Sequence, residues 1–157
     1  MKNLKFYIGC LVILVLGVVA ILAYSSNTSI QQEKRKELDG VQVNNQFVDK
    51  FFNYTTSSQR YENIKPFMTE QGYRSTYPSG MEVPTDESTS VKSFVNSLKS
   101  YVQKEPESNS GHLEIINEFE LTTEFNNVQS SRTFIMKTSL IYDDSVGWKV
   151  NDVDMIM

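Results

Sequence analysis

The chain begins with an apolar run, continues through a polar segment, and then carries apolar residues at helical and later at strand spacing. Residues 6–24 (FYIGCLVILVLGVVAILAY) contain no charged side chain. A helix of this length spans about 28 Å, close to the roughly 30 Å of bilayer hydrocarbon. The run therefore predicts a transmembrane helix within residues 1–24, which holds everything after it at a membrane.

Three kinds of N-terminal signal contain a run of this type. A cleaved signal peptide usually has an apolar region of only about 7–15 residues, shorter than this one. The cleavage-like pattern Ala23, Tyr24, Ser25 nevertheless keeps cleavage open as the alternative. A lipoprotein signal places its apolar run before the modified cysteine, whereas most of the run here follows Cys10. A retained signal anchor fits best.

Basic residues near the run predict its orientation. Lys2, Lys5 and the terminal amine precede it and favour a cytoplasmic N-terminus. The basic residues 34–36 lie on the other side, but three acids are interleaved with them: Glu33, Glu37 and Asp39. We therefore expect a single-pass protein of the cell membrane, with a cytoplasmic N-terminus and an extracytoplasmic C-terminal domain.

The middle of the chain has helical periodicity. Residues 25–40 are polar and predict a stalk that is helical in part at best. Val43, Phe47 and Phe51 then recur at four-residue spacing, beside a second apolar stripe, which predicts an amphipathic helix.

Shorter helices and a loop are expected next. Thr56 and Gln59 have the spacing of a capping box and predict a short helix that Pro66 ends or bends. Residues 67–72 predict one further turn that ends at Gly72. Residues 73–90, with two prolines, a glycine and many hydroxyl side chains, predict an exposed loop.

The second half alternates with period two. Between residues 113 and 125 most odd positions are apolar and most even ones are glutamate, which predicts a half-buried strand. In a second strand the side chains expected to face inward are those of Phe134, Met136, Thr138, Leu140 and Tyr142. A third strand begins at Val146 and continues the alternation with Trp148 and Val150. Residues 91–103 fit a strand or a helix, and we favour a strand because the sheet needs a fourth member. Residues 107–111 and 126–131 predict hairpin turns. Helices followed by an antiparallel meander predict an α+β domain over residues 41–157, with the sheet curled over the helices.

Charge and cysteine content narrow the class of protein. The net charge of −4 and the sequence pI of about 5.0 argue against a nucleic-acid binder. Most acids lie after residue 104, which indicates either a solvated sheet face or a docking surface for a basic partner. Cys10, the single cysteine, lies in the predicted span, so the exterior domain has no disulfide, which suits a Gram-positive bacterium.

The sequence offers no catalytic constellation. His112 is the single histidine, which excludes a histidine triad or a multi-histidine metal site within the chain. Asp143 and Asp144 are interpreted as turn formers. Asp152 and Asp154 share a strand face, and solvated edge acids are a simpler interpretation than a cation site. We predict no catalytic, cofactor-binding or metal-binding residue, and expect that the protein is not an enzyme and uses no cofactor.

Several segments together carry a family resemblance. They are the aromatic helix 47–54 (FVDKFFNY), Arg60 with Tyr61, residues 64–69 leading to Gly72 and Tyr73, and the closing strand 147–153 (GWKVNDV). With the N-terminal span, they make the chain resemble the nuclear-transport-factor-2-like (NTF2-like) fold, a cone of helices wrapped by a curved antiparallel sheet. More narrowly, it looks like the small membrane-anchored assembly proteins of Gram-positive conjugative type IV secretion systems.

The resemblance implies a function. Members of that family are non-catalytic scaffolds that contact other channel subunits and often self-associate, and enzymes of the same fold place acids, histidine or tyrosine inside the cone. We therefore expect a membrane-anchored scaffold of a conjugation channel for plasmid transfer, with no direct contact to nucleic acid. The alternative is an extracytoplasmic ligand-binding domain that uses the cone's cavity, with Asn117 and Thr123 as polar contacts inside it.

Overall fold

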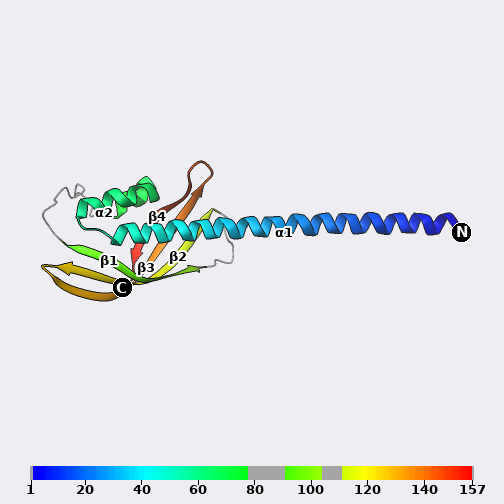
Figure 1. Ribbon diagram of the computed structural model, residues 1–157. Coiled ribbons are helices and arrows are strands. Elements are labelled where there is room, and N and C mark those ends of the chain that lie inside the picture. Colours follow the sequence, from blue (N-terminus) through cyan, green and yellow to red (C-terminus); the bar gives the residue numbers. More distant parts are fainter. Residues whose placement is uncertain (1, 78–90, 104–110, 157) are drawn as a thin grey trace. The chain divides into compact units, whose positions relative to one another are not determined.

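The computed structural model describes residues 2–77, 91–103 and 111–156, which form two compact units, Met1–Lys36 and Glu37–Met157 (Figure 1). The helical elements are α1 (Lys2–Phe52), α2 (Ser57–Ile64), a 3-10 turn η1 (Lys65–Phe67) and α3 (Glu70–Ser75). The strands are β1 (Lys92–Gln103), β2 (His112–Phe125), β3 (Val128–Asp143) and β4 (Gly147–Met155). The loop predicted over residues 73–90 begins too early, because residues 73–75 continue α3; its residues 78–90, and residues 107–110 of the predicted turn, lie outside the described residues.

Helix α1 is unbroken from the apolar run to the domain. The segment 25–40, predicted to be helical only in part, is helical throughout, because its Gln, Glu, Lys and Arg side chains favour a helix and no proline interrupts it. Within the described residues, one N-terminal helix is long and apolar enough to cross a membrane, and the described apolar side chains of its segment 14–24 are exposed.

The C-terminal unit begins at Glu37, before the predicted start at Val41. Gly40 explains the difference, because it is buried and a Cβ there would lie 2.7 Å from Leu113 Cδ2 and 3.1 Å from Trp148 Cε2. The last residues of the predicted stalk therefore already belong to the packed domain.

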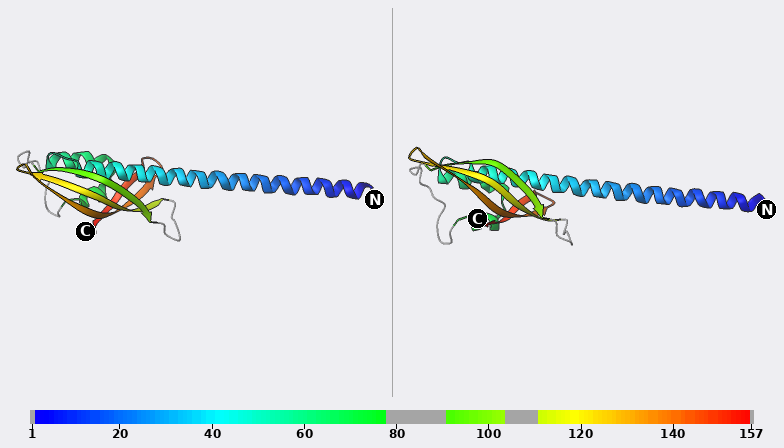
Figure 2. Two further views of the ribbon diagram at one scale, coloured as in Figure 1. Left: turned by 60° about the horizontal axis from the view of Figure 1, so that its bottom comes forward. Right: turned by 90° about the horizontal axis from the view of Figure 1, so that it is seen from below.

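The four strands form one antiparallel sheet in the order β1-β2-β3-β4 (Figure 2). The strand interpretation of residues 91–103 is confirmed, with an irregularity between Asn96 and Lys99. The turn predicted over residues 126–131 is wrong in length, since β3 already starts at Val128. Asn126 and Asn127 alone make the turn, with φ of 50° and 62°, and asparagine tolerates this left-handed conformation well.

The prediction for α2 is confirmed. Thr56 is its N-cap, and Thr56 Oγ1 accepts a hydrogen bond of 3.2 Å from Gln59 N. Gln59 Oε1 in turn accepts one of 3.0 Å from Thr55 N. Pro66 lies in η1 and ends the α-helix before it.

Gly72 does not end a helix as predicted. It lies inside α3, whose N-cap Thr69 accepts a hydrogen bond of 3.0 Å from Gly72 N. The physical reason for glycine is close packing against β4, because a Cβ would lie 2.7 Å from Val150 O and 2.8 Å from Asn151 O.

We expect Gly72→Ala to destabilise the domain by about 1–3 kcal/mol, because its methyl group would press on backbone atoms that cannot move without shifting β4. The denaturant midpoint of the full chain in detergent micelles measures this cost. Gly111→Ala is the matched control, since the nearest atom to its added Cβ lies at 4.0 Å. Equal midpoints for the two variants would contradict the close contact between α3 and β4.

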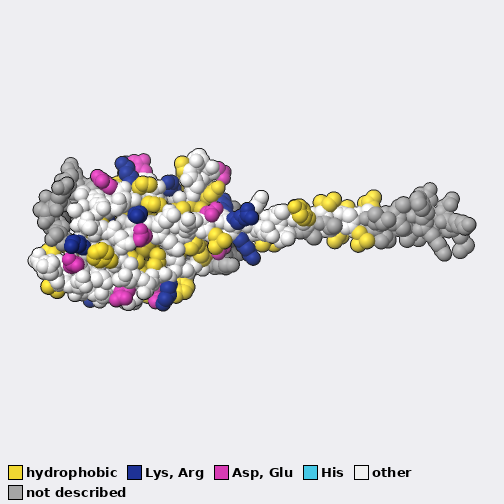
Figure 3. Space-filling model, viewed as in Figure 1, with side chains coloured by type: hydrophobic (Ala, Val, Ile, Leu, Met, Phe, Trp, Pro, Cys, Tyr) yellow, Lys and Arg dark blue, Asp and Glu magenta, His cyan; other side chains and the backbone are white. Residues whose placement is uncertain are grey.

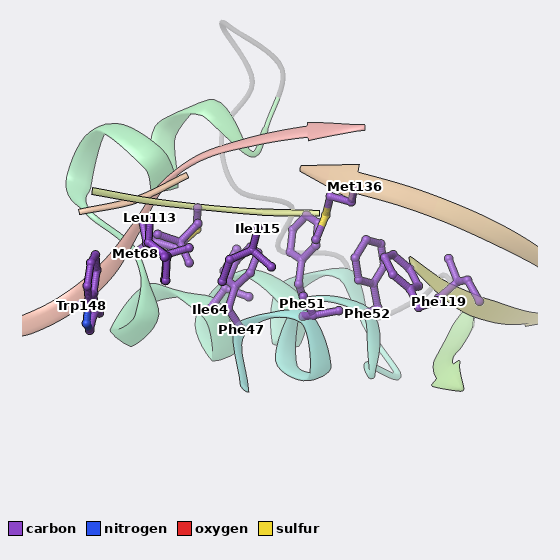
Figure 4. Packing of buried hydrophobic residues seen from close by; sticks show 14 of the residues in the cluster. Phe47, Phe51, Phe52, Ile64, Met68, Leu113, Ile115, Phe119, Met136 and Trp148 are labelled. Atoms are coloured by element: carbon purple, nitrogen blue, oxygen red, sulfur yellow. The ribbon is translucent and has the colours of Figure 1, made fainter. Parts of the chain in front are cut away.

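The hydrophobic core lies between the helices and one face of the sheet (Figure 4). The predicted alternation of inward and outward residues is confirmed for most of β2, β3 and β4. Phe125 and Val146 are exceptions, at 55% and 61% exposed, because both lie at hairpin ends. The buried apolar residues are Phe47, Val48, Phe51, Phe52, Tyr61, Ile64, Met68, Leu113, Ile115, Phe119, Leu121, Met136, Leu140, Trp148 and Val150.

We expect a fragment of residues 37–157 to fold without the N-terminal helix segment. Among the described residues, all of the buried core side chains belong to this unit, and each contributes roughly 1.5–3 kcal/mol only when they pack together. A cooperative thermal transition of the purified fragment is the expected result. A gradual loss of structure on heating would show that the domain needs the segment before Glu37.

Candidate functional site

A cluster of neutral polar side chains lies inside the domain, between α1 and the sheet. Asn44, Asn117 and Thr138, from α1, β2 and β3, are each fully buried. Asn44 Nδ2 donates to Asn117 Oδ1 at 2.7 Å, and Asn117 Nδ2 donates to Thr138 Oγ1 at 3.1 Å. Thr138 Oγ1 donates back to Asn44 Oδ1, which closes a ring of hydrogen bonds. We call these three residues the amide cluster.

The amide cluster extends toward β1. Ser100 Oγ lies 2.9 Å from Asn117 Oδ1 and 2.7 Å from Asn45 Oδ1. The cluster and its extension thus tie α1 to β1, β2 and β3. Buried polar groups cost free energy when they are unpaired, so these bonds favour one register of the helix on the sheet.

Sequence reasoning found part of this cluster. Asn117 was predicted to face inward and does so, whereas Thr123 is only half-buried and its hydroxyl donates to Ser130 O at 3.4 Å, outside the cluster. Asn44 was missed, although it lies three residues before Phe47 on the same apolar stripe of the helix. That position on a core-facing stripe is the signal that could have identified it.

The chemistry available to the amide cluster is limited to hydrogen bonding. Asparagine and threonine side chains neither gain nor lose a proton near neutral pH, so they cannot act as general acid or base. The strongly buried polar residues of the described part of the chain are these three and Ser93, and none is an acid, a histidine or a lysine.

Aromatic side chains of the described residues are buried inside the cone. Among them are Phe47, Phe51, Phe119 and Trp148, and the rings of Phe52 and Phe119 lie tilted to each other by 46° at 4.8 Å (Figure 4). The described grooves lie on the outside instead. One of about 740 Å³ runs along α1 and is lined by Leu38, Val41, Gln42, Asn45, Gln46, Asp49, Lys50 and Phe67.

Three acidic residues of β2 are paired with lysines of neighbouring strands. Each of three glutamates lies within ion-pair distance of a lysine: Glu114 and Lys137 at 3.2 Å, Glu118 and Lys99 at 3.0 Å, Glu124 and Lys92 at 3.2 Å. Acidic and basic side chains are also interspersed on the face of the domain seen in Figure 3. This arrangement favours the solvated sheet face over a docking surface for a basic partner.

These pairings shift the acid strength of the carboxyl groups. Partial burial raises the pKa of Glu114, but the hydrogen bond and charge of Lys137 outweigh it and lower that pKa overall. Hydrogen bonds from Gln129 and Lys92 lower the pKa of Glu124. Both groups are thus held as carboxylates, the opposite of what a general acid needs.

The remaining acids and His112 form no site within the described residues. Asp143 Oδ1 accepts a hydrogen bond of 2.7 Å from Ser145 N, and the bonds from Ser145 lower the pKa of Asp143, as expected for a turn former. Asp154 lies opposite Lys137 in the sheet register. His112 begins β2, where its Nε2 lies 3.8 Å from Glu114 Oε1. No group of three potential metal-binding side chains occurs in the described parts of the chain.

Residues 36–157 match the family described as the YddI NTF2-like domain. The chain belongs to that family. It is also 30% identical over 132 residues to the "Uncharacterized protein YddI" of Bacillus subtilis (strain 168), a match that covers 80% of this chain and 75% of that protein. The family match covers the described C-terminal unit almost residue for residue.

A solved structure supports the fold. An "Ntf2 like protein involved in plasmid conjugation" superposes with a TM-score of 0.51 at 13% sequence identity, over 71% of this chain and 45% of that protein. This chain thus spans less than half the length of that protein. The predicted resemblance and the predicted α+β, NTF2-like fold are both confirmed.

Proposed function

We propose that the protein is a non-catalytic scaffold of a bacterial conjugation channel of the type IV secretion class, anchored in the cell membrane. Its N-terminus lies in the cytoplasm and residues 41–157 lie outside. It binds other subunits of the channel and further copies of itself, and it does not bind nucleic acid directly.

The filled interior of the cone carries this proposal. Where enzymes or receptors of this fold would need a chamber, the domain holds aromatic side chains and a closed ring of neutral hydrogen bonds. An interior packed in this way in the described residues supports a role for the outer surface, as a protein-binding function requires. The link of a structurally similar protein to plasmid conjugation supports the choice of channel.

The unbroken helix α1 supports the anchoring role. It carries the apolar segment and also supplies Phe47, Phe51 and Asn44 to the domain interior. A continuous chain between the apolar segment and the domain would keep the domain at the membrane, where it would meet partners at a raised effective concentration.

Affinity purification tests the proposal. A tagged full-length chain, expressed at its normal level in a mating donor cell and extracted with mild detergent, is expected to co-purify with other transfer proteins. The matched control is the same chain with Trp148→Ala, which is expected to lose those proteins because its domain is destabilised. Recovery of a small molecule with the wild-type domain and of no transfer protein would favour the ligand-binding alternative.

We expect the anchor to be needed for transfer, but not its particular sequence. The span 6–24 holds no charged residue that would line a pathway, so its role is to tether the domain. Replacing it with an unrelated single span of equal length and orientation should leave the mating frequency close to that of the wild type. Deleting it should abolish transfer.

Loss of transfer in the replaced-span variant, at normal expression and topology, would contradict the tethering role. It would indicate that the apolar helix itself recognises a partner inside the bilayer.

A further inference from the structure

One cationic side chain lies among aromatic rings without an acidic partner in the described part of the chain. The guanidinium carbon of Arg60, in α2, lies 3.8 Å from the centre of the Phe51 ring and 5.4 Å from that of Tyr54. The rings of Phe52 and Tyr61 lie at 5.8 and 5.7 Å. We call these five residues the Arg60 corner.

The aromatic rings satisfy the face of the guanidinium but not its edge. Rings attract a cation through their faces and offer no lone pair to the N–H groups in the guanidinium plane. Arg60 Nε is fully buried and has no hydrogen-bond partner, and no ion pair of the described residues includes Arg60. Burial lowers the pKa of Arg60, whereas Tyr54 and Tyr61 raise it. The side chain stays charged, because arginine does not lose its proton in proteins.

A second unpaired polar atom lies next to the same corner. Ser93 is 1% exposed, and its Oγ also lacks a hydrogen-bond partner. Ser93 is held against Tyr54 by two backbone hydrogen bonds, from Tyr54 N at 3.3 Å and to Tyr54 O at 3.1 Å. Buried polar atoms without partners are rare in folded proteins, and both of these border Tyr54.

We propose that the Arg60 corner binds a carboxylate of a partner protein, presented next to an apolar side chain. The planar fork of N–H donors matches the two oxygens of a carboxylate. The surrounding rings exclude water and provide contact for the apolar neighbour. Arg60 is only partly buried, so a partner's carboxylate can reach its terminal N–H groups from outside, whereas the Nε–H lies behind them and reports on the binding.

A polyanionic partner fits the surroundings less well. The chain has a net charge of −4, and the exposed acid Glu62 lies two residues from Arg60 on α2. Nucleic acid or an anionic lipid surface would be repelled by this charge before it reached one recessed arginine. A single carboxylate on a protein meets less repulsion. The binding is a property of the isolated chain and does not depend on which assembly the protein serves.

Nuclear magnetic resonance of the full chain in neutral detergent micelles tests the proposal. The Nε–H resonance of Arg60 is followed during titration with phenylacetate, which pairs a carboxylate with an apolar ring, and in parallel with inorganic phosphate. Arg132, which is exposed on β3, is the internal control. The Arg60 resonance is expected to shift until it reaches a limit. The phenylacetate concentration at half of this shift should be about tenfold lower for Arg60 than for Arg132.

A variant separates binding from general solvent effects. Arg60→Gln should remove the saturable change that phenylacetate causes at the Tyr54 backbone amide, and its spectrum reports whether the domain is still folded. Equal midpoints at Arg60 and Arg132 in the wild-type chain would overturn the proposal without any variant. A lower midpoint for phosphate than for phenylacetate would also overturn it, in favour of a phosphate-bearing partner.

Discussion

Trp148→Ala is expected to lower the free energy of unfolding of the domain by about 3–5 kcal/mol, because a large buried side chain leaves a cavity that its neighbours cannot fill. Trp148 is 6% exposed, and its ring meets that of Tyr142 edge to face at 5.3 Å. It also covers Gly40, at the start of the C-terminal unit. Its loss should therefore loosen α1 from the sheet as well as the end of β4.

Denaturant unfolding of the full chain in micelles measures this effect, with Asp144→Ala as the control. Asp144 is exposed in the turn between β3 and β4, and its removal should change stability by no more than about 0.5 kcal/mol. If Asp144→Ala proved the more damaging change, Trp148 would have to lie on the surface of the domain.

Asn117→Leu is expected to cost about 2–4 kcal/mol, although it replaces a polar core residue with an apolar one. The change leaves Asn44 Nδ2 and Thr138 Oγ1 each with a lost partner inside the domain, and each such loss costs roughly 1–3 kcal/mol. The denaturant midpoint again reports the cost.

The triple variant Asn44→Leu, Asn117→Leu, Thr138→Val sharpens this test. It removes every member of the amide cluster, so no member is left unpaired, and Ser100 Oγ keeps its hydrogen bond to Asn45 Oδ1, so most of the stability lost in Asn117→Leu should return. The contrary result is a triple variant that is less stable than Asn117→Leu, with a total loss equal to the sum of the losses from the three single substitutions. It would show that the hydrogen bonds themselves, and not the avoidance of unpaired groups, stabilise this region.

Much of the fold follows from local patterns in the sequence. The strands were predictable because alternation of apolar and polar residues directly reflects which side chains face the helices, as at Leu113 and Ile115. The cap at Thr56 and the end of α2 at Pro66 were predictable because they depend on neighbours within four residues. The family resemblance followed from the same segments, since the aromatic helix and the closing strand form the two sides of the core.

Errors arose where distant parts of the chain decide the outcome. Gly72 fits the pattern of a helix end, and only the approach of β4 to α3 shows that it is needed for close packing. Phe125 fits an inward position, but the hairpin of β2 and β3 leaves it exposed at its end. Neither fact is encoded in the residues adjacent to these positions.

The sequence alone determined that an apolar helix precedes one α+β domain and that the described strands direct no ionisable group into its core. It could do so because these properties depend on composition and on periodicity. The tertiary structure alone decided that Asn44 forms hydrogen bonds with Asn117 and Thr138. It also decided that Arg60 lies among aromatic rings, with no acidic partner among the described residues. Those residues are far apart along the chain or turned toward one another by packing, and hydrogen bonding and desolvation act only at the short distances that folding creates.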